Sequence, residues 1–238
     1  MQKVLAVIPA RYGSTRFPGK PLAQIAGMSM IRRVVDRVKL CSAVDEIVVA
    51  TDDQRIVDEV AEVCKVVMTQ EHPNGTLRVN EVVETMGWEG VVLNVQGDEP
   101  LLNPKDLDEL IKAVEVSGSG LGTLCCAIPE AEAEDPNRVK VVLSKKGKAL
   151  YFSRSKVPFA RSADEHTYYR HIGLYGFTNT SLAQVCTFGV SDLAEKEGLE
   201  QLTWLENDLD IACSIVGASP IGVDVPEDIN TVEKLLKR

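Results

Sequence analysis

The chain has 238 residues, of which 45% are hydrophobic and 26% are charged, and its formal net charge is −9. This composition is typical of a globular protein long enough to bury a core. A chain this acidic is a poor candidate for non-specific binding to nucleic acid, which needs a basic surface, so we expect no nucleic-acid partner. No stretch approaches the roughly 18 apolar residues of a membrane-spanning helix, so we expect no membrane partner.

The first half alternates short apolar runs with segments of helical periodicity. We expect strands over 4–8, 46–50, 65–69 and 91–95, and helices over 29–40, 53–63, 76–86 and 104–116. An apolar run followed by a helix is the pattern of a βα unit. Four such units in succession predict a mainly parallel sheet with helices on both faces.

The second half is less regular. We expect strands over 121–127, 139–143, 149–152 and 172–177, and helices over 179–186, 198–207 and 226–237. A polar, proline-containing stretch at 153–170 predicts a loop. The chain therefore reads as one α/β domain over 1–238, with an inserted subregion at about 130–185.

The cysteines give no sign of a metal site or of disulfides. None belongs to a Cys-X-X-Cys pair, and their positions are Cys41, Cys64, Cys125, Cys126, Cys186 and Cys213. This spacing predicts neither zinc ligands nor a disulfide framework. Free cysteines suit a reducing compartment, and the N-terminal apolar run is too short for a signal peptide, so we expect a cytoplasmic protein.

Ligands of open parallel sheets bind beyond the carboxyl ends of the strands. The segment after the first expected strand is a loop that carries Arg11, Arg16 and Lys20 among ten residues. Gly13 and Gly19 let its backbone bend close to a ligand. The loop fits neither the P-loop nor the dinucleotide fingerprint, so it is either a triphosphate cradle of its own kind or a solvent-exposed basic loop.

Acidic residues occupy two further segments expected at this edge. Asp98 and Glu99 follow the fourth strand, where they would either hold Mg²⁺ against phosphate oxygens or cap the next helix. Asp224 precedes the last helix and is either a cap or a second Mg²⁺ ligand. Glu227 and Asp228 fall in the first turn of that helix, where its dipole favours acids.

These segments are part of a larger set of motifs. Through this set, the chain resembles the 3-deoxy-manno-octulosonate (Kdo) cytidylyltransferases. The matching segments occur in the family's order, span nearly the whole chain and together are highly specific. They are IPARYGSTRFPGKPL (8–22), ATDD (50–53), NGTLR (74–78), NVQGDEP (94–100), LYFSRSKVPFAR (150–161), RHIGLYGF (170–177), LEQLTWLEND (199–208) and GVDVPEDI (222–229).

The resemblance implies an α/β fold like that of nucleotide-diphospho-sugar transferases, and a homodimer with sugar and dimer contacts in the 130–185 subregion. It also implies transfer of CMP from CTP to the anomeric hydroxyl of Kdo, an acidic 2-keto-3-deoxy sugar, with release of pyrophosphate, for lipopolysaccharide biosynthesis. An alternative is the same reaction on 8-amino-Kdo or a sialic acid. A non-catalytic nucleotide-binding relative is a further alternative.

The same resemblance implies the site residues. The catalytic residues would be Arg11, Lys20, Asp98 and Asp224, and the two aspartates would be the Mg²⁺ ligands. The substrate-binding residues would be Arg16, Arg78, Gln96, Arg154, Arg161, His171, Tyr175, Glu200 and Gln201. Arg16 would bind the CTP phosphates and the stretch 72–78 would help to recognise CTP, whereas the others would meet the sugar.

The chain departs from the family pattern at three positions. Leu77 stands where an acid is usual, Lys156 where proline is common and Asn74 where serine is frequent. Each of these positions lies in a segment that, by the resemblance, would bind CTP or the sugar. These departures bear on the identity of the sugar more than on the reaction.

Overall fold

The computed structural model describes residues 2–13, 17–161, 166–218 and 221–237. The chain forms two compact units, one made of Met1–Asp108 and Pro220–Arg238 and the other of Glu109–Ser219. The subregion expected at 130–185 falls within the second unit, and the reading as one domain with a subregion stays a prediction. No helix in the described ranges is long and apolar enough to cross a membrane.

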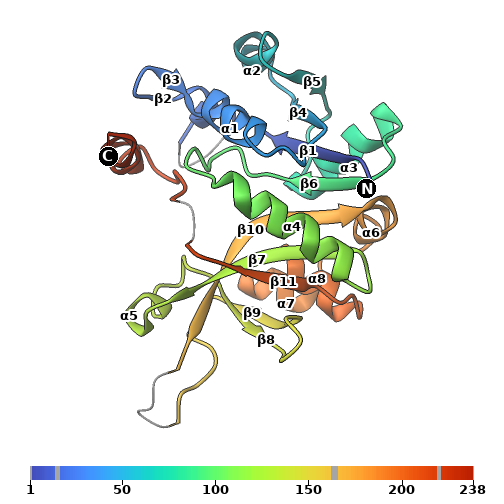
Figure 1. The fold of residues 1–238 in the computed structure, drawn as a ribbon, viewed down its shortest axis with the longest axis vertical. Helices are drawn as coiled ribbons and strands as arrows, with labels where there is room; N and C mark the ends of the chain where they lie inside the picture. Colours follow the sequence, from blue (N-terminus) through green and yellow to red (C-terminus); the bar gives the residue numbers. More distant parts are fainter. Residues whose placement is uncertain (1, 14–16, 162–165, 219–220, 238) are drawn as a thin grey trace. The chain divides into compact units, whose positions relative to one another are not determined.

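The first unit is built on four parallel strands in the order β6-β1-β4-β5 (Figure 1). Their bounds are β1 Val4–Pro9, β4 Glu46–Thr51, β5 Lys65–Met68 and β6 Val91–Asn94. The helices of this unit are η1 Lys20–Leu22, α1 Met30–Lys39, α2 Gln54–Val60, α3 Gly75–Met86 and α9 Asp228–Leu236. A small hairpin pairs β2 (Gln24–Ile25) with β3 (Met28–Ser29), and α4 (Pro104–Val116) begins in this unit and ends in the second.

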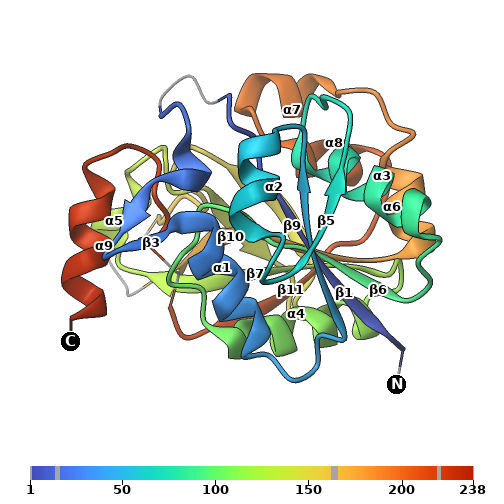
Figure 2. The same ribbon diagram turned by 90° about the horizontal axis from the view of Figure 1, so that it is seen from above.

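Helices cover both faces of this sheet, as the sequence predicts. The chain moves outward from β1 to β4 and β5 through α1 and α2, and then returns past β1 to β6 through α3. Because crossovers between parallel strands are right-handed, the return places α3 on the opposite face from α1 and α2 (Figure 2). The inner strands β1 and β6 are buried on both faces, which explains why β1 reads as a continuous apolar run.

The helices begin where the sequence supplies caps. The Ser29 hydroxyl accepts a hydrogen bond from the Arg32 amide at the start of α1, and the Asn74 side chain does the same for the Leu77 amide at the start of α3. Helix α3 ends at Gly87, whose φ of 57° lies in the left-handed region. This capping fixes the start of α3, which proves important for the site described below.

The second unit contains a mixed sheet in the order β11-β7-β10-β8-β9. Strand β10 runs antiparallel to both β7 and β8, β8 pairs antiparallel with β9, and β11 runs parallel to β7. The strands are β7 Leu121–Ile128, β8 Lys140–Leu143, β9 Ala149–Ser153, β10 Tyr168–Thr178 and β11 Ala212–Val216. The helices are α5 Glu130–Ala133, α6 Asn179–Val185, α7 Asp192–Glu197 and α8 Glu200–Glu206.

The sequence expectations fail mainly in this second unit. The loop expected at 153–170 is wrong at its end, because β10 already begins at the fully buried Tyr168. The helix expected at 198–207 begins at Glu200, and the preceding α7 was not expected; Gly198 separates the two at a φ of 62°. Strand β11 was also not expected, because its five residues include Ser214 and lack a clear alternation.

Candidate active site

A cavity of about 280 Å³ lies in the first unit beyond the carboxyl ends of β1 and β6. Its lining comes from 9–11, 20–21, 72–75 and 96–98, together with Arg78 and Asp224. The three segments that the sequence places at this sheet edge therefore meet. The cavity gathers six of the predicted site residues, namely Arg11, Lys20, Arg78, Gln96, Asp98 and Asp224.

Lys20 ties the cavity walls together. Its Nζ donates to Asp98 Oδ2 over 2.6 Å and to the Val223 carbonyl over 3.0 Å. The Val223 amide in turn donates to the Asp98 carbonyl over 2.9 Å. One ammonium group thus joins the loop after β1, the turn after β6 and the segment before α9, and it has a third N–H donor besides these two.

Close packing of backbone shapes the turn after β6. A Cβ atom added to Gly97 would lie 3.1 Å from the Pro9 carbonyl oxygen, a distance shorter than most real Cβ contacts. Glycine therefore lets this turn approach the end of β1. The approach sets Asp98 next to the basic loop.

Asp224 is held in a separate way. The Asp228 carboxylate accepts hydrogen bonds from the Asp224 amide over 2.8 Å and from the Val225 amide over 3.0 Å. Asp228, expected as a first-turn acid, thus also holds the backbone that carries Asp224. The capping role considered for Asp98 is taken by Asn103, whose side chain accepts from the Lys105 amide at the start of α4.

The donor set of the cavity fits Mg²⁺. Asp98 and Asp224 both line it, and a backbone hydrogen bond joins their segments. Mg²⁺ is usually held by one or two carboxylates and completes its shell with water and phosphate oxygens. Among the described residues no group of three or more His, Cys, Asp or Glu could hold a metal, so a site with more protein ligands is not found there.

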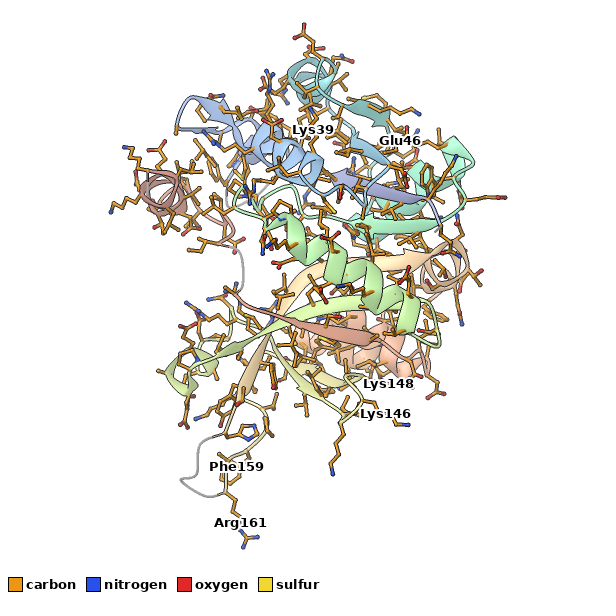
Figure 3. All side chains as sticks on the ribbon, viewed as in Figure 1. Lys39, Glu46, Lys146, Lys148, Phe159 and Arg161 are labelled. Atoms are coloured by element: carbon orange, nitrogen blue, oxygen red, sulfur yellow. The ribbon has the colours of Figure 1, made fainter. Side chains whose placement is uncertain are left out.

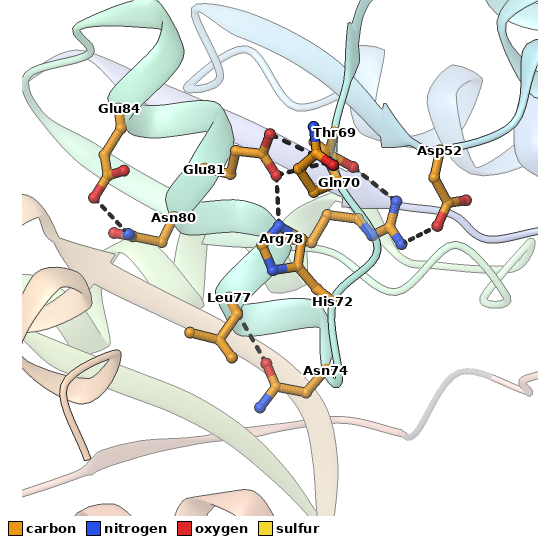
Figure 4. A network of polar contacts seen from close by, with 10 residues as sticks. All are labelled: Asp52, Thr69, Gln70, His72, Asn74, Leu77, Arg78, Asn80, Glu81 and Glu84. Carbon is orange, nitrogen blue, oxygen red and sulfur yellow. Dashed lines mark hydrogen bonds and ion pairs between the residues drawn. The ribbon is translucent and has the colours of Figure 1, made fainter. Parts of the chain in front are cut away.

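Arg78 is the most buried cation at the cavity, with only 4% of its side chain exposed. Its Nη2 donates to Asp52 Oδ2 over 2.6 Å and its Nη1 to Thr69 Oγ1 over 2.7 Å (Figure 4). Neither partner was predicted as a site residue. Asp52 and Arg78 are 26 positions apart, so no local sequence pattern predicts that they form an ion pair.

The structure explains two of the three departures from the family pattern, Asn74 and Lys156, and places the third, Leu77. Asn74 caps α3, as a serine would. Leu77 lies in the first turn and points away from the Arg78 guanidinium (Figure 4). The Lys156 ammonium pairs with Glu130 over 2.6 Å and with Glu134 over 2.8 Å, which raises the pKa of Lys156 and binds its segment to α5.

In the second unit, His171 and Tyr175 lie with ring centroids 5.5 Å apart. A register shift between Ile172 and Tyr175 means that simple strand alternation does not explain this proximity. Burial lowers the pKa of His171 to about 3, so the imidazole is neutral at physiological pH, and its Nε2 lies 2.9 Å from Thr123 Oγ1. Burial and the Glu200 charge raise the pKa of Tyr175.

The remaining predicted sugar ligands differ in their surroundings. Gln201 is buried and its Nε2 has no hydrogen-bond partner among the residues that the structure describes, so it is available to a ligand or a water molecule. The Arg154 guanidinium donates to the carbonyls of Glu197, Pro136 and Gly198. Arg161 is exposed on a segment that projects beyond the strands of its unit (Figure 3). Arg16 lies outside the described residues.

Lys140 is a buried cation that the sequence did not single out. Its Nζ donates to the Arg154 carbonyl over 2.6 Å and to the Asp135 carbonyl over 2.9 Å, and burial lowers its pKa. Lys140→Met would remove the ammonium donor from both carbonyls, and the Asp135 carbonyl would keep only the Arg138 amide, over 3.1 Å. We therefore expect the free energy of unfolding to fall by about 1–3 kcal/mol in a urea titration. Lys146→Met, in the exposed turn between β8 and β9, is the control, and equal unfolding midpoints for the two variants would contradict this role.

Comparison with known proteins identifies the family. A family model described as Cytidylyltransferase matches residues 5–211. The 3-deoxy-manno-octulosonate cytidylyltransferase of Nitratidesulfovibrio vulgaris is 44% identical, over 97% of this chain and 95% of the relative. The chain belongs to the 3-deoxy-manno-octulosonate cytidylyltransferase family. The resemblance stated from the sequence motifs is thereby confirmed, as is the class of nucleotidyltransferase.

Two further similar proteins are named for their ligands. A solved structure of CMP:2-keto-3-deoxy-manno-octonic acid synthetase complexed with CTP has a TM-score of 0.93 at 38% identity, covering 99% of this chain and 98% of that one. The 8-amino-3,8-dideoxy-manno-octulosonate cytidylyltransferase of Shewanella pealeana is 41% identical over 98% of each chain. The fold class is confirmed, and the two relatives are named for different sugars.

Proposed function

We propose that this protein transfers CMP from CTP to the anomeric hydroxyl of Kdo, with release of pyrophosphate, as a step of lipopolysaccharide biosynthesis. We further propose that it acts in the cytoplasm as a homodimer. The observation that carries the proposal is the cavity in which Arg11 and Lys20 lie with Asp98 and Asp224 at one sheet edge. A triphosphate and its cation need that combination of charges.

Arg11 and Lys20 would bind the phosphates of CTP. Arginine offers paired N–H donors to phosphate oxygens, and the Lys20 ammonium adds a compact charge with one donor beyond its two protein bonds. The sugar hydroxyl oxygen then forms a bond to the α-phosphorus while the bond from that phosphorus to the pyrophosphate oxygen breaks. Such a displacement needs mainly alignment and charge neutralisation from the protein.

Asp98 and Asp224 would hold Mg²⁺, which when bound neutralises phosphate charge and lowers the pKa of a coordinated hydroxyl. The protein's own contribution is to keep the two carboxylates in place. Lys20 does so for Asp98 through a 2.6 Å ion pair. Asp228 does so for Asp224 by accepting from its amide.

The acidic sugar calls for arginine donors toward its carboxylate and neutral polar groups toward its hydroxyls. We assign these roles to Gln96, Arg154, Arg161, His171, Tyr175, Glu200 and Gln201. A neutral His171 supports the second role, because an uncharged imidazole can donate one hydrogen bond and accept another. The Gln201 amide nitrogen, which has no partner within the described part of the chain, offers a further donor.

The proposal is tested by pyrophosphate release from CTP and Mg²⁺ with Kdo, 8-amino-Kdo and N-acetylneuraminate in parallel. We expect kcat/KM to be highest with Kdo, by about tenfold or more, which corresponds to about 1.4 kcal/mol of transition-state discrimination. Preference for the amino sugar would change the acceptor and keep the reaction. Absence of pyrophosphate with all three sugars would contradict the proposed activity.

A further inference from the structure

Two carboxylates stand behind the wall of the cavity without lining it. Asp52 follows β4 and Glu81 lies on α3, and each bonds to a side chain that does line the cavity (Figure 4). Asp52 bonds to Arg78 and Glu81 bonds to His72. Each pair contains one residue of the stretch 72–78, so both carboxylates contact the same part of the cavity lining from outside it.

The first pair fixes the Arg78 guanidinium at two points. Asp52 accepts a hydrogen bond from Nη2, and the Thr69 hydroxyl accepts one from Nη1. The Thr69 amide also donates to the Thr51 carbonyl over 2.9 Å, which joins the segment after β5 to the end of β4, just before Asp52. A guanidinium has five N–H donors in one rigid plane. Anchoring two nitrogens therefore determines the plane and direction in which its other donors can meet a ligand.

The second pair fixes the loop between β5 and α3. Glu81 Oε2 lies 2.5 Å from His72 Nε2, and both carboxylate oxygens accept from the Gln70 amide, over 3.2 and 3.0 Å. Burial alone would raise the pKa of Glu81, but these hydrogen bonds and the nearby charges of His72 and Arg78 outweigh it and lower that pKa. The carboxylate is thus ionised at neutral pH and suited to hold the loop.

We propose that Asp52 and Glu81 are positioning residues that hold Arg78 and His72 in place to recognise the nucleotide base. The inference rests on the proposed function, in which the cavity binds CTP. Cytosine presents two adjacent acceptors, O2 and N3, which suit the parallel donors of a guanidinium. Uracil instead carries a hydrogen on N3, so a correctly oriented Arg78 would favour CTP over UTP.

The test compares Glu81→Gln and Asp52→Asn with Glu84→Gln. Glu84 lies on the same helix and bonds only to the exposed Asn80 side chain in Figure 4, over 2.8 Å, so its variant removes the same charge away from the cavity. The readouts are the Kd for CTP and for UTP by calorimetry, KM and kcat with Kdo, and the melting temperature. All three variants are made in the full chain.

We expect Glu81→Gln and Asp52→Asn to raise the Kd for CTP about tenfold and to reduce the preference for CTP over UTP about fivefold or more, as expected from weakening a charge-assisted hydrogen bond. The kcat at saturating CTP and the KM for Kdo should change by less than about threefold, because neither carboxylate touches the reacting atoms. Glu84→Gln should leave all these values within about twofold of the wild type.

The positioning role is overturned if Glu81→Gln leaves the Kd and the base preference unchanged, even with a lower melting temperature, or if Glu84→Gln changes them equally. Glu81→Gln decides the question if Asp52→Asn does not fold. If the wild-type protein binds CTP but releases no pyrophosphate with Kdo, Kdo is not the acceptor. The comparison of Kd values would still test the positioning role. A wild type that does not bind CTP would overturn both proposals.

Discussion

Asp224→Asn will lower kcat by about 10²–10³ while the melting temperature stays close to that of the wild type. The substitution keeps the size of the side chain and removes one of the two carboxylate charges at the cavity. The loop should keep its shape, because its backbone is held by Asp228 through the amides of residues 224 and 225. Steady-state pyrophosphate release, with a thermal melt of the same preparation, measures both quantities.

Glu227→Gln is the matched control for Asp224→Asn. Glu227 is an exposed acid three residues further along, outside the lining of the cavity. It should behave as the wild type in both measurements. Full activity of Asp224→Asn would contradict the two-carboxylate site, and a large fall in its melting temperature would assign Asp224 to folding instead.

Lys20→Met will lower kcat/KM for CTP by about 10³, the combined effect of losing a phosphate contact and leaving Asp98 without its cation. The Lys20 side chain is only 17% exposed, so water compensates little for the lost ammonium. The KM for Kdo should change far less than that for CTP. Initial rates over a matrix of CTP and Kdo concentrations separate the two constants.

Lys65→Met supplies the comparison for Lys20→Met. Lys65 makes an exposed ion pair with Glu46 over 2.8 Å, away from the cavity, so its loss should change kcat/KM by less than about twofold. If Lys20→Met retained wild-type affinity for CTP, the triphosphate would have to bind elsewhere. A proportionate rise in the KM for Kdo would show a general disturbance of the protein.

The fold of the first unit could be predicted from the sequence because its signals are local. Strands such as β1 are buried on both faces, so they read as unbroken apolar runs, and α1 and α3 begin at capping side chains. In the second unit the pairing is long-range: β10 begins in a polar stretch because Tyr168 packs into the core. Strand β11 forms by pairing with the edge of β7, and the sequence of its own five residues does not predict a strand.

The position of the candidate site at one sheet edge could also be predicted from the sequence. The residues that hold its lining in place could not. The rule for parallel sheets brings together the segments that contain Lys20, Asp98 and Asp224, and the motifs supply their expected roles. The partner of Arg78, Asp52, and the partner of His72, Glu81, lie in other elements, so they could be found only in three dimensions. The same holds for Lys140, a lysine inside an apolar strand whose carbonyl partners lie 5 and 14 residues away.

A crystal structure of this protein with CTP and Mg²⁺ tests whether the cavity of the first unit binds both ligands. We expect phosphate oxygens against Arg11 and Lys20, the cation on Asp98 and Asp224, and the cytosine against Arg78. Nucleotide bound away from this cavity, or a cation that contacts neither aspartate, would contradict this expectation.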